Sequence, residues 1–195
     1  MLLLDKYDVI VAIWKWLQSC SHNDIMRLPK LTKGLDIRTL NLSDEEVRFL
    51  GMVIAAGSCQ PRFKVSPFGD HEHGNQNRYK NIADNLFKIK HWEIKEGCYS
   101  EIENQTATWF IDPPYQVGGH KYTHSKINYT ALKEWSENRE GQVIVCENMA
   151  ADWMDFKPLC KTQGVKNTNT VEAIWSNQKT NYDNIQHALF EQATT

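Results

Sequence analysis

No stretch of this 195-residue sequence is apolar for long enough to cross a lipid bilayer. We also expect no secretory signal, because Asp5 and Asp8 interrupt the apolar residues at the N-terminus. The five cysteines are odd in number and scattered, and none forms a C-x-x-C pair. We therefore expect a cytoplasmic protein with reduced thiols and no membrane partner.

A net positive charge is lacking too, since 22 lysines and arginines stand against 24 aspartates and glutamates. A whole-chain sum says little about nucleic-acid binding, which depends on a local basic surface. Basic and aromatic residues mix most densely between residues 62 and 90, and the basic ones include Arg62, Lys64, Arg78 and Lys80. This segment is either a DNA-contacting surface or a solvated loop and helix face.

Glycine-rich motifs are also absent. None of the ten glycines forms a G-x-G pattern, and Gly118-Gly119 is the only close pair. Repeats and low-complexity segments are not visible either. The length corresponds to about one domain with a single core, so we predict one domain over residues 1–195.

Apolar periodicity predicts strands that alternate with helices, which is typical of an α/β fold with a mostly parallel sheet. Strands are expected at residues 2–4, 92–94, 108–111, 142–147 and 171–176. Helices are expected at about 9–17, 43–57, 78–90 and 129–135, with Ser43 and Glu46 as a capping pair. Residues 58–77 are predicted to form a loop. The largely helical stretch 20–90 interrupts the alternation and is interpreted as an insertion.

The most informative segment is Asp112-Pro113-Pro114-Tyr115, which follows the β-branched and aromatic residues 108–111. Two prolines fix φ and remove two backbone donors, so the strand must end in a rigid loop. Open α/β sheets bind ligands at this end of their strands. The carboxylate and a proline carbonyl can accept hydrogen bonds from an amino group, and the tyrosine can stack on a ring. The segment therefore suits a flat, amino-bearing ring, and a plain Pro-Pro turn is the alternative.

The segment resembles the (Asp/Asn/Ser)-Pro-Pro-(Tyr/Phe) signature of DNA amino-methyltransferases, and its Asp form resembles the adenine-N6 branch. Residues 2–5, 141–148 and 171–177 are similar to the second strand, a later core strand and a strand near the C-terminus of that family. The resemblance implies a Rossmann-like methyltransferase sheet with residues 20–90 as the target-recognition part. It also implies a site-specific DNA methyltransferase of a bacterial or phage-infected cell.

The same resemblance implies S-adenosylmethionine as cofactor and a DNA duplex with a flipped adenine as partner. Asp112 and the Pro113 carbonyl would accept hydrogen bonds from the adenine amine. Pro114 completes the rigid loop, and Tyr115 would hold the flipped base. Asp112 would also border the cofactor.

Asp5 corresponds to the acid that binds the cofactor ribose in the family, although a strand-terminal Asp is often only a cap for the next helix. Cys98 and Tyr99 stand where relatives have an acidic or polar contact to the cofactor's adenine, and this departure weakens that contact. Lys121 and Tyr122 lie in a loop that would order over DNA, the alternative being a plain mobile loop. A metal is not expected, because His71-x-His73 is a weak pattern and the chemistry needs none.

The family's first strand and its glycine-rich loop have no counterpart in the sequence. We expect a truncated chain, a separate N-terminal segment that supplies the motif, or a protein that is no longer an enzyme. Two other functions stay open: a catalytically inactive methyltransferase-like DNA-binding protein, and an amino-methyltransferase acting on cytosine N4 or RNA. Asp112 argues mildly against the latter, because those relatives more often carry Asn or Ser at this position.

Overall fold

The computed structural model describes residues 1–55, 59–66, 72–163 and 169–178. The chain divides into two compact units, Met1–Glu101 and Ile102–Thr195. Each unit has a hydrophobic core of its own. Both units combine strands with helices, which confirms the predicted α/β class.

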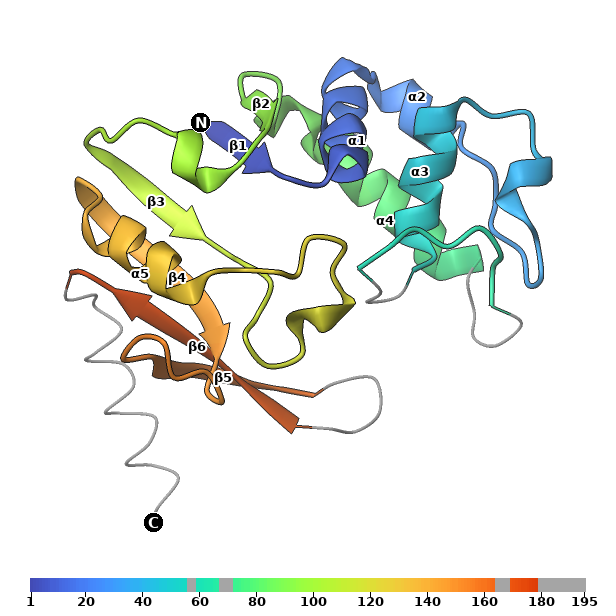
Figure 1. Ribbon diagram of the computed structural model, residues 1–195. Coiled ribbons are helices and arrows are strands. Elements are labelled where there is room, and N and C mark those ends of the chain that lie inside the picture. Colours follow the sequence, from blue (N-terminus) through green and yellow to red (C-terminus); the bar gives the residue numbers. More distant parts are fainter. Residues whose placement is uncertain (56–58, 67–71, 164–168, 179–195) are drawn as a thin grey trace, which may run out of the picture. The chain divides into compact units, whose positions relative to one another are not determined.

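The first unit joins a short parallel pair of strands to a group of helices (Figure 1). β1 (Leu2–Asp5) pairs with β2 (Glu93–Glu96), so that Asp5 stands opposite Glu96. Between them in sequence lie α1 (Asp8–Ser19), α2 (His22–Met26), η1 (Ile37–Thr39), α3 (Asp44–Val53), α4 (Glu72–Asn85) and η2 (Leu86–Lys88), and η3 (Tyr99–Glu101) follows β2. The strands expected at 2–4 and 92–94 and the helix expected at 9–17 are confirmed within about two residues.

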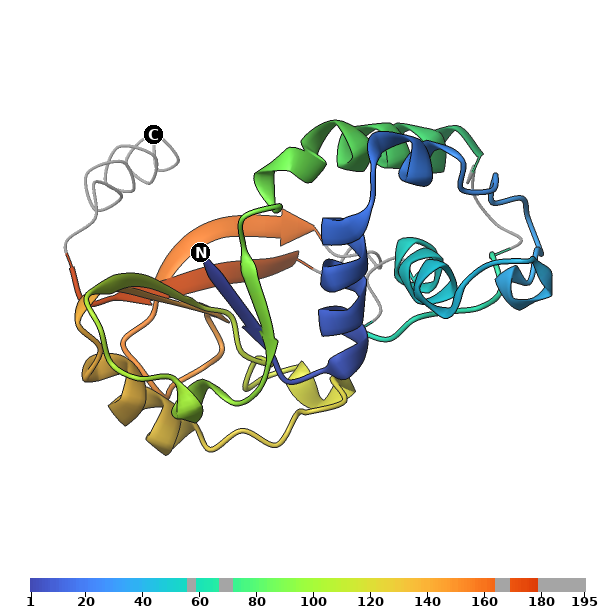
Figure 2. The same cartoon turned by 90° about the horizontal axis from the view of Figure 1, so that it is seen from above.

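Helix α3 of this unit begins at the cap that the sequence predicts. Ser43 Oγ accepts from the Glu46 backbone N–H at 3.2 Å, and the Glu46 carboxylate accepts from the Ser43 N–H at 2.8 Å. This confirms the predicted capping pair of α3. Figure 2 shows α3 beside α1, and Trp16 of α1 packs on Phe49 of α3 with ring centroids 5.2 Å apart. α3 ends at Val53, and residue 57, where we expected the helix to end, lies outside the described residues.

The loop expected at 58–77 is wrong in its last part, because α4 begins at residue 72. Asn75 and Tyr79 lie one helical turn apart, and both are buried in the first unit. The Tyr79 hydroxyl donates to the Pro29 carbonyl at 3.3 Å. Burial of this face therefore prevails over the weak helix propensity of the residues before position 78.

In its described residues, the second unit is a mixed four-stranded sheet with one α-helix. Its strand order is β3 (Ala107–Ile111), β4 (Gly141–Asn148), β6 (Asn169–Ser176) and β5 (Lys157–Gln163). β3 and β4 are parallel, and α5 (Tyr129–Glu137) lies in the crossover between them. The helix expected at 129–135 and the strands expected at 108–111, 142–147 and 171–176 are confirmed.

The expectation of a mostly parallel sheet is wrong for this unit, because β6 is antiparallel to both β4 and β5. Parallel neighbours need a crossover of about a dozen residues or more. β5 ends at residue 163 and β6 begins at residue 169, so these strands can only pair as a hairpin. β5 itself was not predicted: it contains Pro158 and lies at the sheet edge, where its ladder is irregular between Pro158 and Cys160.

One face of this sheet forms the core of the second unit. Val143 and Val145 of β4 are fully buried and pack with Trp109, Ile111 and Ala173. Because side chains alternate along a strand, Glu147 falls on the same face of β4, and it too is fully buried.

In the described ranges, no helix has the length and apolarity that a bilayer span requires.

The start of β4 offers a test of the β3–β4 pairing. Gly141 has φ of 93°, and a Cβ at this position would collide with the backbone of Ala107, its partner on β3. We expect Gly141→Ala to destabilise the protein by at least about 2 kcal/mol, measured by urea unfolding. Gly118 has a similar φ of 95°, but a Cβ added there would meet nothing within 4 Å. Gly118→Ala is therefore the control and should cost about 1 kcal/mol, and equal losses would contradict the role of the close contact.

Candidate functional site

The candidate site is the loop that follows β3, at the C-terminal ends of β3 and β4. The last paired residues of the two strands are Ile111 and Val145. Asp112 lies one residue further, so its side chain falls on the sheet face opposite to Ile111, level with Cys146. The two prolines that follow end the strand, as the sequence predicts.

The buried carboxylate of Glu147 anchors this loop to the end of β4. One oxygen, Oε1, accepts from the Gln116 backbone N–H at 2.5 Å and from the Trp153 indole N–H at 3.3 Å. The other oxygen, Oε2, accepts from the Asn148 backbone N–H at 2.8 Å. Three donors thus compensate one fully buried charge, and the first of them fixes the residue directly after Tyr115.

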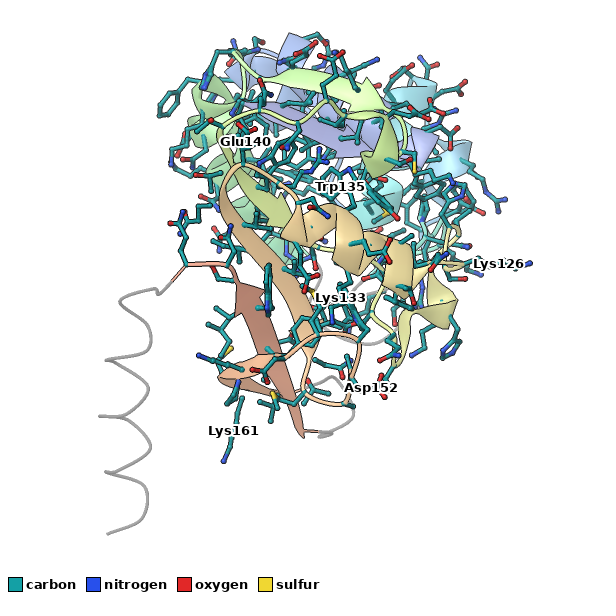
Figure 3. All side chains as sticks on the ribbon, turned by 60° about the vertical axis from the view of Figure 1, so that its left-hand side comes forward. Lys126, Lys133, Trp135, Glu140, Asp152 and Lys161 are labelled. Carbon is teal, nitrogen blue, oxygen red and sulfur yellow. The ribbon has the colours of Figure 1, made fainter. Side chains whose placement is uncertain are left out.

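Side chains beyond β4 hold the rest of the loop. Gln116 and Asp152 bind each other twice: the amide donates to the carboxylate at 2.9 Å, and the Asp152 N–H donates to the amide oxygen at 3.0 Å. The Asn148 amide donates to the Val117 carbonyl at 2.9 Å. In Figure 3, Asp152 and Glu140 mark opposite ends of β4, so these contacts gather at one end of the strand. The loop is therefore fixed from the β4 side.

The loop also folds back on itself after the prolines. The Gly119 N–H donates to the Tyr115 carbonyl at 2.9 Å. A Cβ at Gly119 would lie 2.9 Å from the carbonyl carbon of Pro114, so only glycine allows this close approach. The predicted mobile or DNA-ordering stretch thus begins with a tight return turn, which continues into η4 (Gly119–Lys121).

Two tyrosine hydroxyls complete the support of the loop. Tyr129, the first residue of α5, donates to the Pro114 carbonyl at 2.8 Å. Tyr115 donates to Oε2 of Glu172 on β6 at 2.9 Å. The carbonyl of Pro114 and the hydroxyl of Tyr115 are therefore both engaged within the protein.

Two acceptors of the loop remain without a hydrogen bond from the described part of the chain: the Asp112 carboxylate and the Pro113 carbonyl. They are adjacent in sequence at the end of a rigid strand. Because residues 113 and 114 are prolines, the backbone has no N–H group between Asp112 and Tyr115 that could compete with a ligand for these acceptors. The loop thus offers a ligand two acceptors, which is the pattern that an amino group requires.

The electrostatic surroundings of the loop are strongly acidic. Asp112 is exposed by surface area, but surrounding protein atoms limit its hydration, and this burial raises its pKa, with the charges of Glu172 and Glu147 adding to the effect. Burial, together with Asp112 and Glu172, raises the pKa of the Cys146 thiol to about 11. Burial and the hydrogen bond to Glu172 raise the pKa of Tyr115. Tyr115 and Cys146 are therefore neutral at physiological pH, and Asp112 is a more basic carboxylate than usual.

Three of the four residues expected to bind the cofactor, Asp5, Cys98 and Tyr99, lie in the first unit, at one end of the β1–β2 pair, whereas Asp112 lies in the second unit. Gly97 N–H donates to the Asp5 carbonyl at 3.1 Å, and Cys98 and Tyr99 follow directly. Asp5 Oδ1 accepts from the Tyr7 N–H at 2.7 Å in the turn before α1, but it does not cap that helix, whose N-cap residue is Tyr7 and has no side-chain cap bond. A hydrogen bond from the Ser100 hydroxyl lowers the pKa of Cys98. The parallel register thus brings these three residues to the same edge.

Four of the five basic residues expected to contact DNA, Arg62, Lys64, Arg78 and Lys80, also lie in the first unit, and all four are exposed. Two of them are engaged: the Arg78 guanidinium donates to the Val53 carbonyl at 3.1 Å, and Lys80 forms a 2.5 Å ion pair with Asp84. Arg62 and Lys64 belong to a segment that pairs with residues 35–37 through backbone hydrogen bonds.

The structure adds one residue to this surface that sequence patterns did not reveal, Arg38, which is ion-paired with Asp36 at 2.6 Å. Arg38 lies over the ring of Phe63 at 5.0 Å, and Phe63 is 40% exposed between Arg62 and Lys64. Their proximity depends on pairing between segments about 25 residues apart, which no local pattern indicates. Lys121 and Tyr122 are exposed as well, but they belong to the second unit.

The weak metal-binding pattern of the sequence, His71-x-His73, is only partly described by the structure. His71 and the side chain of His73 lie outside the described residues. Within the described ranges, no group of three or more His, Cys, Asp or Glu side chains is arranged to hold a metal ion.

The residues that support the loop were missed from the sequence, among them Glu147, Glu172 and Tyr129. Glu147 had a usable signal, because it continues the alternation of Val143 and Val145 into the core. Glu172 and Tyr129 had none, since their bonds join residues 57 and 15 positions apart. No family model matches the chain, and no curated protein is similar to it in sequence.

Glu147 provides a direct test of how the loop is held. Glu147→Gln replaces one acceptor oxygen with an NH2 group that faces an N–H donor. We expect it to destabilise the protein by about 2–3 kcal/mol in urea unfolding. Glu134→Gln, on the exposed side of α5, is the matched control and should leave stability within about 0.5 kcal/mol of the wild type. A loss as small as that of the control would show that the buried carboxylate does not anchor the loop.

Proposed function

We propose that the protein is a DNA methyltransferase that transfers a methyl group from S-adenosylmethionine to adenine N6. The observation that carries the proposal is the pair of adjacent acceptors, the Asp112 carboxylate and the Pro113 carbonyl, at the end of a rigid strand. An exocyclic amine has two hydrogens, and the pair can accept both. The hydrogen bonds of the Pro114 carbonyl, the Gln116 N–H and the Val117 carbonyl hold the loop that carries these two groups.

The fold is compatible with this proposal. Ligands of open α/β sheets bind outside the C-terminal ends of parallel strands. Both parallel pairs, β1–β2 and β3–β4, carry candidate residues at these ends, Asp5 with Cys98 in one and Asp112 in the other. We infer a Rossmann-like methyltransferase fold for the chain, with the antiparallel β6 in its C-terminal part.

The loop residues have defined tasks in such a reaction. The amine lone pair of adenine is conjugated with the ring, so the nitrogen is a weak nucleophile. Hydrogen bonds from the amine to Asp112 and the Pro113 carbonyl return electron density to the nitrogen. When the new nitrogen–carbon bond forms, the amine must lose one proton, and Asp112, whose pKa is raised, is placed to accept it. Tyr115 offers its ring face to the base once the base has left the duplex.

The cofactor would supply an electrophilic methyl group on a sulfonium without help from a metal. Asp5 fits a contact with ribose hydroxyls, because only its Oδ1 accepts a hydrogen bond from the described residues. Cys98 and Tyr99 follow at the same strand end and would border the adenine of the cofactor. The remaining task of the chain is to align these groups.

Asp112→Ala is the primary test of the proposed chemistry. We expect the rate of methyl transfer to adenine-containing duplex DNA to fall by about 10²–10³, since a pre-placed polar group at the reacting atom is lost. Transfer of tritiated methyl groups measures the rate, and digestion of the product identifies the methylated base. Asp155→Ala, an exposed aspartate of the same unit, is the control. Full activity of Asp112→Ala would refute the assignment, and N4-methylcytosine as product would transfer it to cytosine.

The pH dependence of the same assay follows from the sign of the pKa shift. Asp112 accepts hydrogen bonds and a proton only when it is ionised, and its pKa is raised by burial and by Glu172 and Glu147. Activity should therefore be full above this raised pKa and disappear as the pH falls through it. A rate that stays constant down to the ordinary range of an aspartate would contradict this role.

The basic surface can be tested by the salt dependence of DNA binding. The slope of log K against log salt is negative for DNA binding. Replacing both Arg62 and Lys64 with alanine should make it shallower by about two, one for each lost phosphate contact. Lys80→Ala should change the slope less, because Lys80 is ion-paired with Asp84. A fluorescence titration at several salt concentrations gives the slopes. Identical slopes in the wild type and the double variant would place the DNA-binding surface elsewhere.

A further inference from the structure

Tyr115 is held by a residue of a different strand, and this contact suggests a role for that residue. Its hydroxyl donates to Oε2 of Glu172 at 2.9 Å, across 57 positions of sequence. Glu172 stands opposite Asn148 of β4 and opposite Cys160 of β5. By strand alternation it shares a sheet face with Cys146, the residue that is level with Asp112. The carboxylate thus lies on the face to which Asp112 belongs.

Glu172 is itself fixed from the other side. Thr162 Oγ1 on β5 lies 3.3 Å from Oε1 of Glu172, within hydrogen-bond distance. The same hydroxyl lies 2.7 Å from Oγ1 of Thr170. The carboxylate therefore has one oxygen directed to β5 and one directed to Tyr115. Such a doubly held acceptor restricts the rotation of the tyrosine side chain far more than solvent would.

We propose that Glu172 is the positioning residue of the site: its carboxylate holds Tyr115 by the hydroxyl, so that the ring stands fixed beside Asp112 where the flat substrate base is to be bound. This inference rests on the proposed function and extends it to a residue that does not itself touch the reacting atoms. Support comes from the shared sheet face, the 2.9 Å bond and the engagement of both carboxylate oxygens.

The charge of Glu172 gives this positioning role a second consequence. Asp112 is surrounded by Glu172 on β6, by Glu147 and Cys146 on β4, and by Tyr115 of its own loop. Among these groups, Glu172 contributes more than Glu147 to the raised pKa of Asp112. A purely structural contact would fix the ring and leave the titration of Asp112 unchanged. The two roles can therefore be separated by replacing the charge and keeping the hydrogen bond.

Four variants of the full chain test the proposal: Glu172→Gln, Glu172→Ala, Tyr115→Phe, and the double variant Tyr115→Phe/Glu172→Ala. Glutamine keeps an acceptor for the tyrosine hydroxyl, so Glu172→Gln should retain most of the turnover at neutral pH. Its acidic limb should move to lower pH, because the negative charge beside Asp112 is removed. Glu172→Ala and Tyr115→Phe should each lower kcat about tenfold through a misplaced ring. The double variant should lose no more activity than the less active of these two single variants, because both changes break the same contact.

Glu140→Gln is the matched control, because this exposed glutamate also accepts from a threonine hydroxyl, that of Thr106, but lies at the opposite end of β4 (Figure 3). It should change neither kcat nor the acidic limb. Additive losses in the double variant, or an acidic limb that does not move in Glu172→Gln, would overturn the proposal.

Two measurements on the unliganded protein separate this inference from the proposed function. Carbon NMR of labelled aspartate follows the titration of Asp112, whose pKa should fall in Glu172→Gln and stay unchanged in Glu140→Gln. Urea unfolding of the single and double variants should show coupling between Tyr115 and Glu172. If the wild type methylates no nucleic acid, the proposed function is wrong, and these measurements still decide whether Glu172 holds Tyr115 and acts on Asp112. An unchanged titration without coupling refutes the inference even in an active enzyme.

Discussion

The rest of the candidate site depends on the burial of one charge, the carboxylate of Glu147. Removing a carboxylate from water costs several kcal/mol, and three N–H donors at 2.5, 2.8 and 3.3 Å offset this cost with hydrogen bonds worth about 1.5–3 kcal/mol each. One donor belongs to β4, one to Trp153 and one to the loop after the prolines. If the loop left β4, the buried carboxylate of Glu147 would lose one of its hydrogen-bond donors. The conformation of the loop is therefore coupled to the packing of the core.

That rigidity explains how an acidic site can persist. Burial, together with the charges of Glu172 and Glu147, raises the pKa of Asp112, so the folded protein disfavours the ionised form of this carboxylate. This electrostatic cost is tolerated because other contacts fix the geometry of the loop. Here those contacts are the Tyr129 bond to the Pro114 carbonyl, the paired bonds between Gln116 and Asp152, and the close packing of Gly119 on Pro114.

Features that depend on neighbouring residues could be predicted from the sequence, and features that depend on distant pairing could not. Residues 108–115 specify a strand and its abrupt end because β-branched and aromatic residues precede two prolines. The capping pair of α3 is equally local. The antiparallel direction of β6, the edge strand β5 with its proline, and the bond from Tyr115 to Glu172 depend on which strands become neighbours. Local sequence patterns do not indicate which distant strands become neighbours, so these features could not be predicted.

The choice of aspartate at position 112 follows from the same arrangement. An asparagine would accept one hydrogen bond through its oxygen, but it could not take up the proton that an amine loses when it is alkylated. An ordinary surface aspartate could accept the proton only weakly, since its conjugate acid is strong. Asp112 lies between these cases, because burial and two neighbouring carboxylates make it more basic while prolines keep competing donors away. The acidic surroundings that disfavour its charge are thus what makes it a useful proton acceptor in the proposed reaction.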